Sequence, residues 1–258
     1  MTRFSLFGLV VFSLSLSACG ASAPGATNGP SQVPPASSAA TPSPSPSPSE
    51  TACQGIGSGE ALPAGAACWI DIATDDNTPI RVHYTVPAAD WFAFIGSAKD
   101  AGEDQDPERV GVLIADIWNL TTDACDEQSA AMPPVGPLVD DLAVALTQLP
   151  PFEVSSPPTT VAAHGYSGTH LQIRIPLDQP FDEERTFSGC TDGVLASWMS
   201  PPLNPAFYGY VAPGDTEDFW ILDVEGTRVV IVALATANAS DKLLAEQQAV
   251  LDSIVIGP

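Results

Sequence analysis

One short stretch of the chain contains residue types that could catalyse acyl transfer. In HGYSGTH, Ser167 lies between two glycines and is flanked by His164 and His170. A serine nucleophile needs a histidine base, and a nucleophile elbow has the pattern G-x-S-x-G between a strand and a helix. Here Gly168 follows the serine directly, and a strand-like alternation comes next. We therefore interpret Gly165 and Gly168 as turn residues and Ser167 as a polar turn side chain, and we assign no catalytic residue.

Clustered carboxylates are the other groups that could do chemistry. They occur in EDQDPE (Glu103 to Glu108), DEE (Asp182 to Glu184) and DTED (Asp215 to Asp218). None has the D-x-D-x-D-G spacing of a calcium loop, so we interpret them as loops kept soluble by charge, and we expect no metal or other cofactor. The formal net charge of −23 argues against nucleic acid as a partner and against basic docking to anionic lipid.

The cysteines predict an oxidising compartment. Apart from Cys19, the chain has four, Cys53, Cys68, Cys125 and Cys190, an even number that predicts two disulfides in an exported protein. Three pairings are open. We favour Cys53 with Cys68, which are close in sequence, and Cys125 with Cys190, which lie in two polar segments. Because no C-x-x-C pair or histidine at ligand spacing accompanies them, we expect no zinc site.

The N-terminus predicts export. Arg3 precedes an apolar run, Phe4 to Leu16, which is shorter than the ~20 residues of a spanning helix and is typical of a signal peptide. The run ends in LSAC, which resembles the bacterial lipobox, whose cysteine accepts diacylglycerol. We expect residues 1–18 to be removed, leaving Cys19 as a lipidated, palmitate-bearing N-terminus at the outer face of the cell membrane. The alternative is a plain signal peptide cut after an A-x-A-like site.

A composition change divides the rest of the chain. Residues 19–51 are almost entirely Ala, Gly, Pro, Ser and Thr, which predicts a disordered, extended linker because such residues bury too little apolar surface. Residues 52–258 are long enough for one domain with a sizeable core.

Apolar periodicity predicts an α+β domain. Alternation over Ile80 to Val86 and Leu171 to Ile175 predicts half-buried strands. Further strands are expected at Val110 to Trp118, Val194 to Met199, Phe219 to Val224 and Val229 to Leu234, with a hairpin turn at Glu225 to Arg228. Helical spacing appears in residues 137–149 and 240–254. The predicted fold is an antiparallel β-sheet flanked by at least two α-helices.

Aromatic residues suggest one candidate ligand rim. Most of them sit in or beside expected strands and are expected to pack in the core. Phe207, Tyr208 and Tyr210 instead lie in the Pro/Gly-rich stretch NPAFYGYVAPG. They could form the rim of a ligand site, or they could cover a sheet edge, which is the use we favour.

Three stretches of the domain carry a family resemblance. They are PPVGPLVDDLAVAL (Pro133 to Leu146), VAAHGYSGTHLQIRIP (Val161 to Pro176) and the C-terminal run from Asp218 to Ile256. Together they resemble a family of actinobacterial cell-envelope lipoproteins of uncharacterised function, some of which are similar to the PsbP-type fold. The resemblance implies an antiparallel sheet flanked by helices and brings no catalytic residues with it.

Two classes of function follow from these observations. The first is a non-enzymatic accessory or binding lipoprotein, anchored through N-terminal diacylglycerol and contacting an envelope protein, a cell-wall polymer or a small ligand. The second is an envelope-directed hydrolase with Asp182, Glu183 or Glu184 as acid and base.

Overall fold

Most of the expected strands and both expected helices recur in the structure, which is a computed structural model. It describes residues 51–52, 59–74, 78–103, 106–200, 210 and 212–257. The alternating stretch that begins at Ile80 forms β4 (Ile80–Thr85), and the one around Leu171 forms the second half of β10 (Tyr166–Arg174). In both strands one face is buried, as period-two alternation requires.

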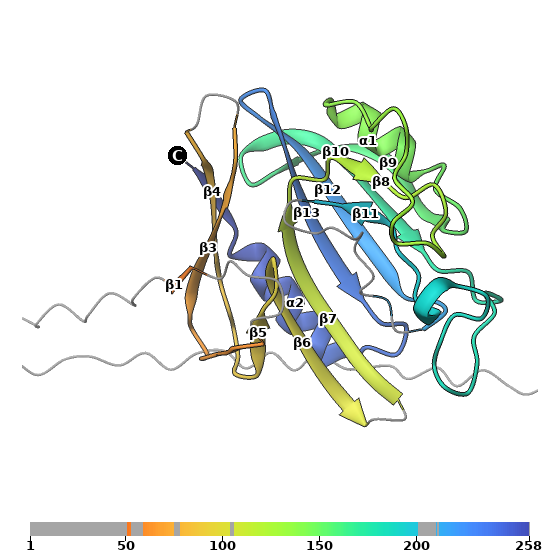
Figure 1. Ribbon diagram of the computed structural model, residues 1–258. Coiled ribbons are helices and arrows are strands. Elements are labelled where there is room, and N and C mark those ends of the chain that lie inside the picture. The colour runs from red at the N-terminus through yellow and green to blue at the C-terminus, as the bar shows by residue number, and fades with distance from the viewer. Residues whose placement is uncertain are drawn as a thin grey trace, which may run out of the picture. The chain divides into compact units, whose positions relative to one another are not determined.

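A large antiparallel sheet forms the centre of the domain (Figure 1). Its eight strands pair in the order β2-β5-β6-β7-β13-β12-β10-β9, and every neighbouring pair is antiparallel. Besides β10, these strands are β2 (Ala61–Leu62), β5 (Trp91–Ala93), β6 (Gly96–Glu103), β7 (Asp106–Ala115), β9 (Glu153–Ala163), β12 (Thr216–Val224) and β13 (Thr227–Ala235).

Two smaller sheets accompany it. One has the order β1-β3-β4-β14, with β1 (Thr51–Ala52), β3 (Ala67–Ile72) and β14 (Val255–Gly257), and β1 is parallel to β3. The other pairs β8 (Asn119–Leu120) with β11 (Trp198–Met199).

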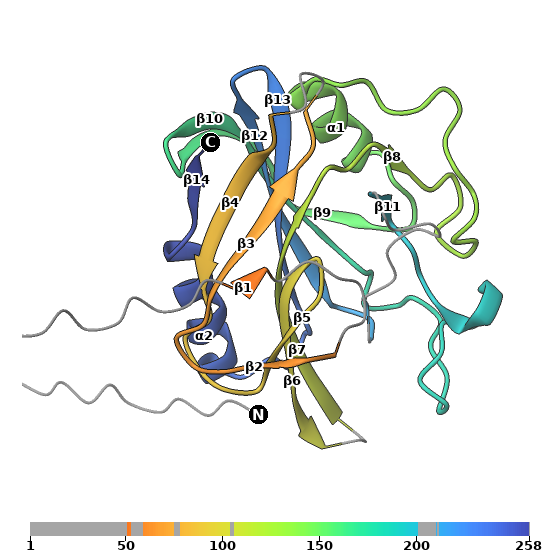
Figure 2. The same ribbon diagram turned by 60° about the vertical axis from the view of Figure 1, so that its left-hand side comes forward.

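Two α-helices of the described chain pack on opposite faces of the large sheet, as Figures 1 and 2 show. Helix α2 (Asp241–Asp252) and the four-stranded sheet share a core with one face of β7 and β13. Helix α1 (Val139–Leu146) buries Leu142 and Leu146 in a second core on the other face, together with apolar residues of β10 and β12. The predicted antiparallel sheet with two flanking helices is thus confirmed for the part of the chain described above.

Strand β9 forms one edge of the large sheet. None of its 11 residues is buried, and no other strand of the described chain pairs with its outer side. Pro157 and Pro158 lie in the middle of the strand, where the pairing with β10 has a bulge, so both face a single residue of β10.

Two details of the sequence prediction are wrong. Ser167 and Gly168 are not turn residues but lie inside β10, and a Cβ added at Gly168 would stand 2.1 Å from the backbone oxygen of Ile221. The turn before β10 is made by His164 and Gly165, both of which have positive φ. The strand expected over Val194 to Met199 is regular only at Trp198 and Met199.

Among the described residues, no helix is both long enough and apolar enough to cross a membrane.

Candidate functional site

Ser167 and His170 point to opposite faces of the large sheet. They lie three residues apart in β10, which pairs with β12 in unbroken register, so their side chains alternate. His170 is bonded instead to Asp218, with 2.9 Å between Nε2 and Oδ1, and Gln172 donates to the other oxygen of Asp218 at 2.6 Å. The structure therefore brings a histidine and a carboxylate together, but on the face away from Ser167.

His164 has a backbone role. It has a φ of 52° in the turn that joins β9 to β10. Burial lowers the pKa of its imidazole.

Ser167 lines a groove on the α1 face of the sheet, which we call the serine groove. Its volume is about 380 Å³, and it lies where the β12–β13 hairpin and the first turn of α1 meet β9 and β10. The lining groups that matter for binding are the hydroxyls of Thr160, Ser167 and Thr169 and the carboxylates of Asp140 and Asp223. The groove thus presents a mixed polar surface at one end of the sheet.

Arg228 holds one wall of the serine groove in place. Its guanidinium donates to the backbone oxygens of Gly136 (2.5 Å), Leu138 (3.1 Å) and Ile117. Burial lowers the pKa of this side chain. These contacts hold the segment before α1 against the sheet. The guanidinium of Arg228 therefore has a structural role.

A second groove lies on the opposite face of the same hairpin, and we call it the tyrosine groove. Its volume is about 260 Å³, and Tyr166 lines it with Ile80, Val224, Glu225 and Thr227. Because Tyr166 and Ser167 are neighbours in β10, they line grooves on opposite faces. Gly226 borders both grooves, so they meet at the tip of the β12–β13 hairpin.

Some polar groups of the two grooves form hydrogen bonds within the protein, and others do not. Asp223 accepts a hydrogen bond from the backbone N of Gly226 at 2.8 Å and so stabilises the turn. By contrast, five hydroxyls and two carboxylates form no hydrogen bond or ion pair with the described part of the chain; they belong to Thr160, Tyr166, Ser167, Thr169, Thr227, Asp140 and Glu225. These groups are available to a ligand.

Tyr210, one residue of the candidate rim, is half-buried, and its hydroxyl is directed inward. It donates to Glu217 at 2.5 Å, and its ring lies against Phe152 with 5.2 Å between centroids. The other two rim residues, Phe207 and Tyr208, lie outside the described residues. For Tyr210, the structure favours packing against the sheet over a place on an open rim.

Glu217 is a functional candidate that the sequence interpretation missed. It is fully buried in β12, and it accepts hydrogen bonds from Trp198 (3.2 Å) and Ser197 (3.4 Å) as well as from Tyr210. Burial raises the pKa of its carboxyl to about 7, although the three donors act in the opposite direction. A carboxyl with such a pKa could act as acid or base, but neither groove includes it. A sequence signal existed, because Glu217 is in phase with the buried residues Phe219 and Ile221.

The DTED cluster is not the charged loop that was expected. Asp215 is buried and accepts hydrogen bonds from the backbone N atoms of Ala212 (2.9 Å) and Ala237 (3.0 Å). Glu217 and Asp218 then alternate to opposite faces of β12. The three carboxylates therefore serve three separate structural contacts.

The hydrogen bonds of Asp182 are typical of a residue that stabilises a turn, not of one carboxylate of a catalytic pair. Its carboxylate accepts hydrogen bonds from the backbone N (2.7 Å) and the hydroxyl (2.5 Å) of Thr186, which lower its pKa. Within the residues described, no three His, Cys, Asp or Glu side chains are grouped so that they could hold a metal ion.

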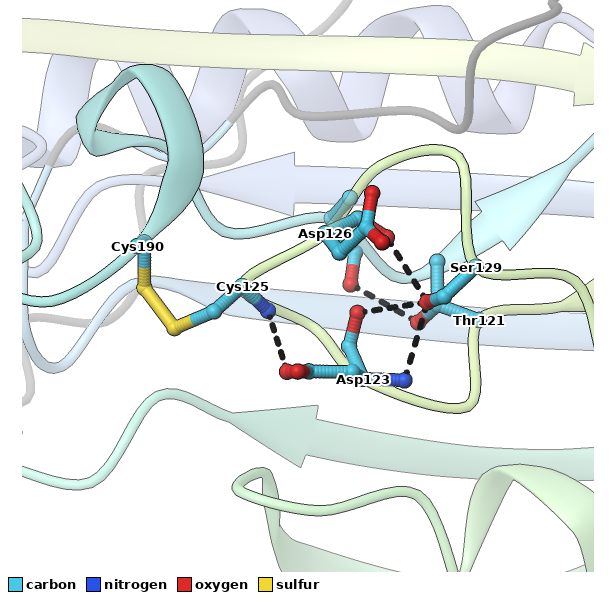
Figure 3. The surroundings of a disulfide bond; sticks show 7 residues. Thr121, Asp123, Cys125, Asp126, Ser129 and Cys190 are labelled. Carbon is cyan, nitrogen blue, oxygen red and sulfur yellow. Dashed lines mark hydrogen bonds between the residues drawn. A yellow bond between two sulfur atoms is a disulfide. The ribbon is translucent and has the colours of Figure 1, made fainter.

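A disulfide joins Cys125 to Cys190, the pairing expected from the sequence (Figure 3). The loop that carries Cys125 is ordered locally, because Asp123 accepts from the backbone N of Cys125 and Ser129 donates to the backbone oxygens of Asp123 and Asp126. Cys68 is also disulfide-bonded. Cys53 and Cys19 lie outside the described residues, so the pairing of Cys53 with Cys68 and the lipidation of Cys19 stay predictions.

Comparison with known proteins does not place the chain in a family. No protein-family model matches it, and no curated protein matches it. Among solved structures, it is similar to the crystal structure of LpqN, a protein involved in cell envelope biogenesis of Mycobacterium tuberculosis. The TM-score is 0.30 and the sequence identity 13%, over 77% of this chain and 91% of that chain. At this level, function has to be argued from the residues of this chain.

Proposed function

We propose that the protein is a lipid-anchored extracytoplasmic binding protein of non-enzymatic type, whose ligand site is the hairpin end of the large sheet. The observation that carries the proposal is a pair of grooves in which several lining hydroxyls and carboxylates, those of Thr160, Tyr166, Ser167, Thr169, Asp140 and Glu225 among them, have no hydrogen-bond or ion-pair partner in the described chain. The placement of Ser167 away from His170 and Asp218 supports binding over acyl transfer. The net charge of −23 argues against nucleic acid as the ligand.

The anchor rests on the sequence around Cys19, and its test is direct. We expect the wild-type protein to enter the detergent phase in a phase-partition experiment and Cys19→Ala to stay in the aqueous phase, because the variant cannot accept diacylglycerol. Equal partition of the two proteins would refute the anchor.

The binding site is tested by cross-linking in cells. A photoreactive amino acid replaces the exposed Ser167 in the full chain, and the control carries it at Leu177, which is 72% exposed and lines neither groove. We expect a discrete adduct from position 167 and none from position 177. The same adducts from both positions, or none from position 167, would contradict a ligand site at this end of the sheet.

The alternative of an envelope-directed hydrolase predicts a different result. Replacing Asp182 by Asn and Glu183 and Glu184 by Gln would abolish turnover of envelope material if these carboxylates were acid and base. We expect the triple variant to keep the wild-type cellular phenotype, because the hydrogen bonds of Asp182 are those of a turn.

A further inference from the structure

We propose that the serine groove and the tyrosine groove form one continuous site for an uncharged, polyhydroxylated ligand, namely an oligosaccharide segment that crosses the β12–β13 turn. This inference rests on the proposed binding function and adds the chemical class of the ligand.

The polar groups point to a ligand rich in hydroxyls. In the serine groove, the hydroxyls of Thr160, Ser167 and Thr169 are each able to donate and accept, and none is bonded within the described chain. The carboxylate of Asp140, equally unengaged, is a strong acceptor for a sugar hydroxyl. A sugar offers donors and acceptors on neighbouring carbons and would match this mixed lining.

The charges argue against an anionic ligand. Among the described residues, Arg228 is the only cation that lines either groove, and its guanidinium is already bonded to three backbone oxygens. Asp140, Asp223 and Glu225 border the grooves, so a phosphate or carboxylate would be repelled at both ends. These carboxylates are divided between the two faces of the hairpin and form no group able to hold a metal ion.

Apolar surface is present in both grooves beside the polar groups. In the tyrosine groove the ring of Tyr166 lies with Ile80 and Val224, and in the serine groove Leu138 and Val139 form an apolar ledge. The C–H face of a sugar ring packs on such surfaces while its hydroxyls reach polar partners at the rim.

The hairpin tip allows one ligand to reach both grooves. Gly226 lies between them, and a Cβ added at this glycine would have no heavy atom within 4 Å. The space over the turn is therefore open, so a chain of several sugar residues could pass from one groove to the other. Two short grooves of about 380 and 260 Å³ would then act as subsites of one site.

The test uses the full-length protein in detergent micelles on an array of neutral glycans, with polyglycerol phosphate and spermine as charged probes. Thr169→Val removes a hydroxyl from the serine groove, and Tyr166→Phe removes one from the tyrosine groove. Thr216→Val is the control, because Thr216 is also a half-buried strand threonine but lines neither groove. We expect binding to a neutral glycan that weakens about fivefold in each groove variant, the effect of about 1 kcal/mol per hydrogen bond, and is unchanged in the control.

Each other outcome overturns part of the reasoning. Binding that depends on one groove alone refutes the continuous site. Groove-dependent binding of polyglycerol phosphate or spermine, or no glycan binding at all, refutes the ligand class. If the cross-linker at position 167 still captures a non-glycan partner, the binding function stands without the sugar, whereas failure of both experiments removes both proposals.

Discussion

Replacing Glu217 by Gln is expected to stabilise the domain at alkaline pH and to have little effect at acidic pH. The pKa of Glu217 is raised from its usual 4.5 to about 7, so between these values the folded protein binds a proton that the unfolded chain releases. The stability contributed by the protonated carboxyl is fully present below pH 4.5 and is lost as the pH rises through 7. Gln resembles the protonated acid because it has one donor group, its NH2, and one acceptor oxygen, and it does not titrate.

The size of the effect follows from the two pKa values. A difference of one pKa unit corresponds to about 1.4 kcal/mol, so ionisation of Glu217 in the folded state costs about 3 kcal/mol. Burial justifies the use of the whole shift, because the side chain is 0% exposed. The free energies of unfolding of wild type and Glu217→Gln should be nearly equal at pH 4.5 and differ by about 3 kcal/mol at pH 8.

The measurement is urea denaturation followed by circular dichroism between pH 4.5 and 8. Asp182→Asn is the control of opposite sign, because hydrogen bonds from Thr186 lower the pKa of Asp182. That variant should be less stable than wild type by the same amount throughout this pH range, because the usual pKa of Asp182, 3.8, and its lowered pKa in the folded protein both lie below pH 4.5. If Glu217→Gln lost stability equally at both ends of the pH range, the ionised carboxylate would be the favoured buried form and the argument would be wrong.

Two further substitutions, each with a matched control, test the packing around the site and the α2 core. Glu246→Ala should destabilise the domain by about 3 kcal/mol, because it leaves Lys99, bonded at 2.8 Å and only 8% exposed, without its counter-charge. Lys242→Ala removes an exposed partner of the same carboxylate at 3.9 Å and should change the free energy of unfolding by less than about 0.5 kcal/mol; equal effects in denaturant titrations would contradict the assignment. Gly168→Ala should lower the midpoint of thermal unfolding strongly, because its Cβ would collide with the backbone of β12, whereas Gly257→Ala, with open space around it, should leave the midpoint nearly unchanged.

The sequence predicted the parts of the fold that depend on local periodicity. Ile80 to Val86 and Leu171 to Ile175 alternate cleanly because each strand has one buried face, and both stretches are strands. Helix α1 was found because Leu142 and Leu146 repeat with helical spacing, which is again a local signal. Strand β9 has no such signal, since none of its residues is buried and its two prolines argue against a strand.

The candidate site depended on contacts that are distant in sequence. Ser167 could be assigned to a groove only after β9, β12 and α1 were placed around it. The alternation along β12 indicates that Glu217 is buried, but no local spacing relates it to its hydrogen-bond partners, Ser197, Trp198 and Tyr210. The DTED cluster was misinterpreted for the same reason. Composition shows that the segment carries several charges, but it does not show which of these side chains the fold buries.

The two prolines of β9 affect how copies of the protein can coexist. If the protein is anchored as proposed, its copies are confined to a plane, where their effective concentration is high. An exposed edge of 11 residues would offer neighbouring copies a template for adding a strand. Pro157 and Pro158 provide no N–H donor, and the bulge beside them breaks the regular spacing of the outer edge. The edge is therefore unsuited to pairing with itself, so copies anchored as proposed could crowd on one membrane without joining through β9.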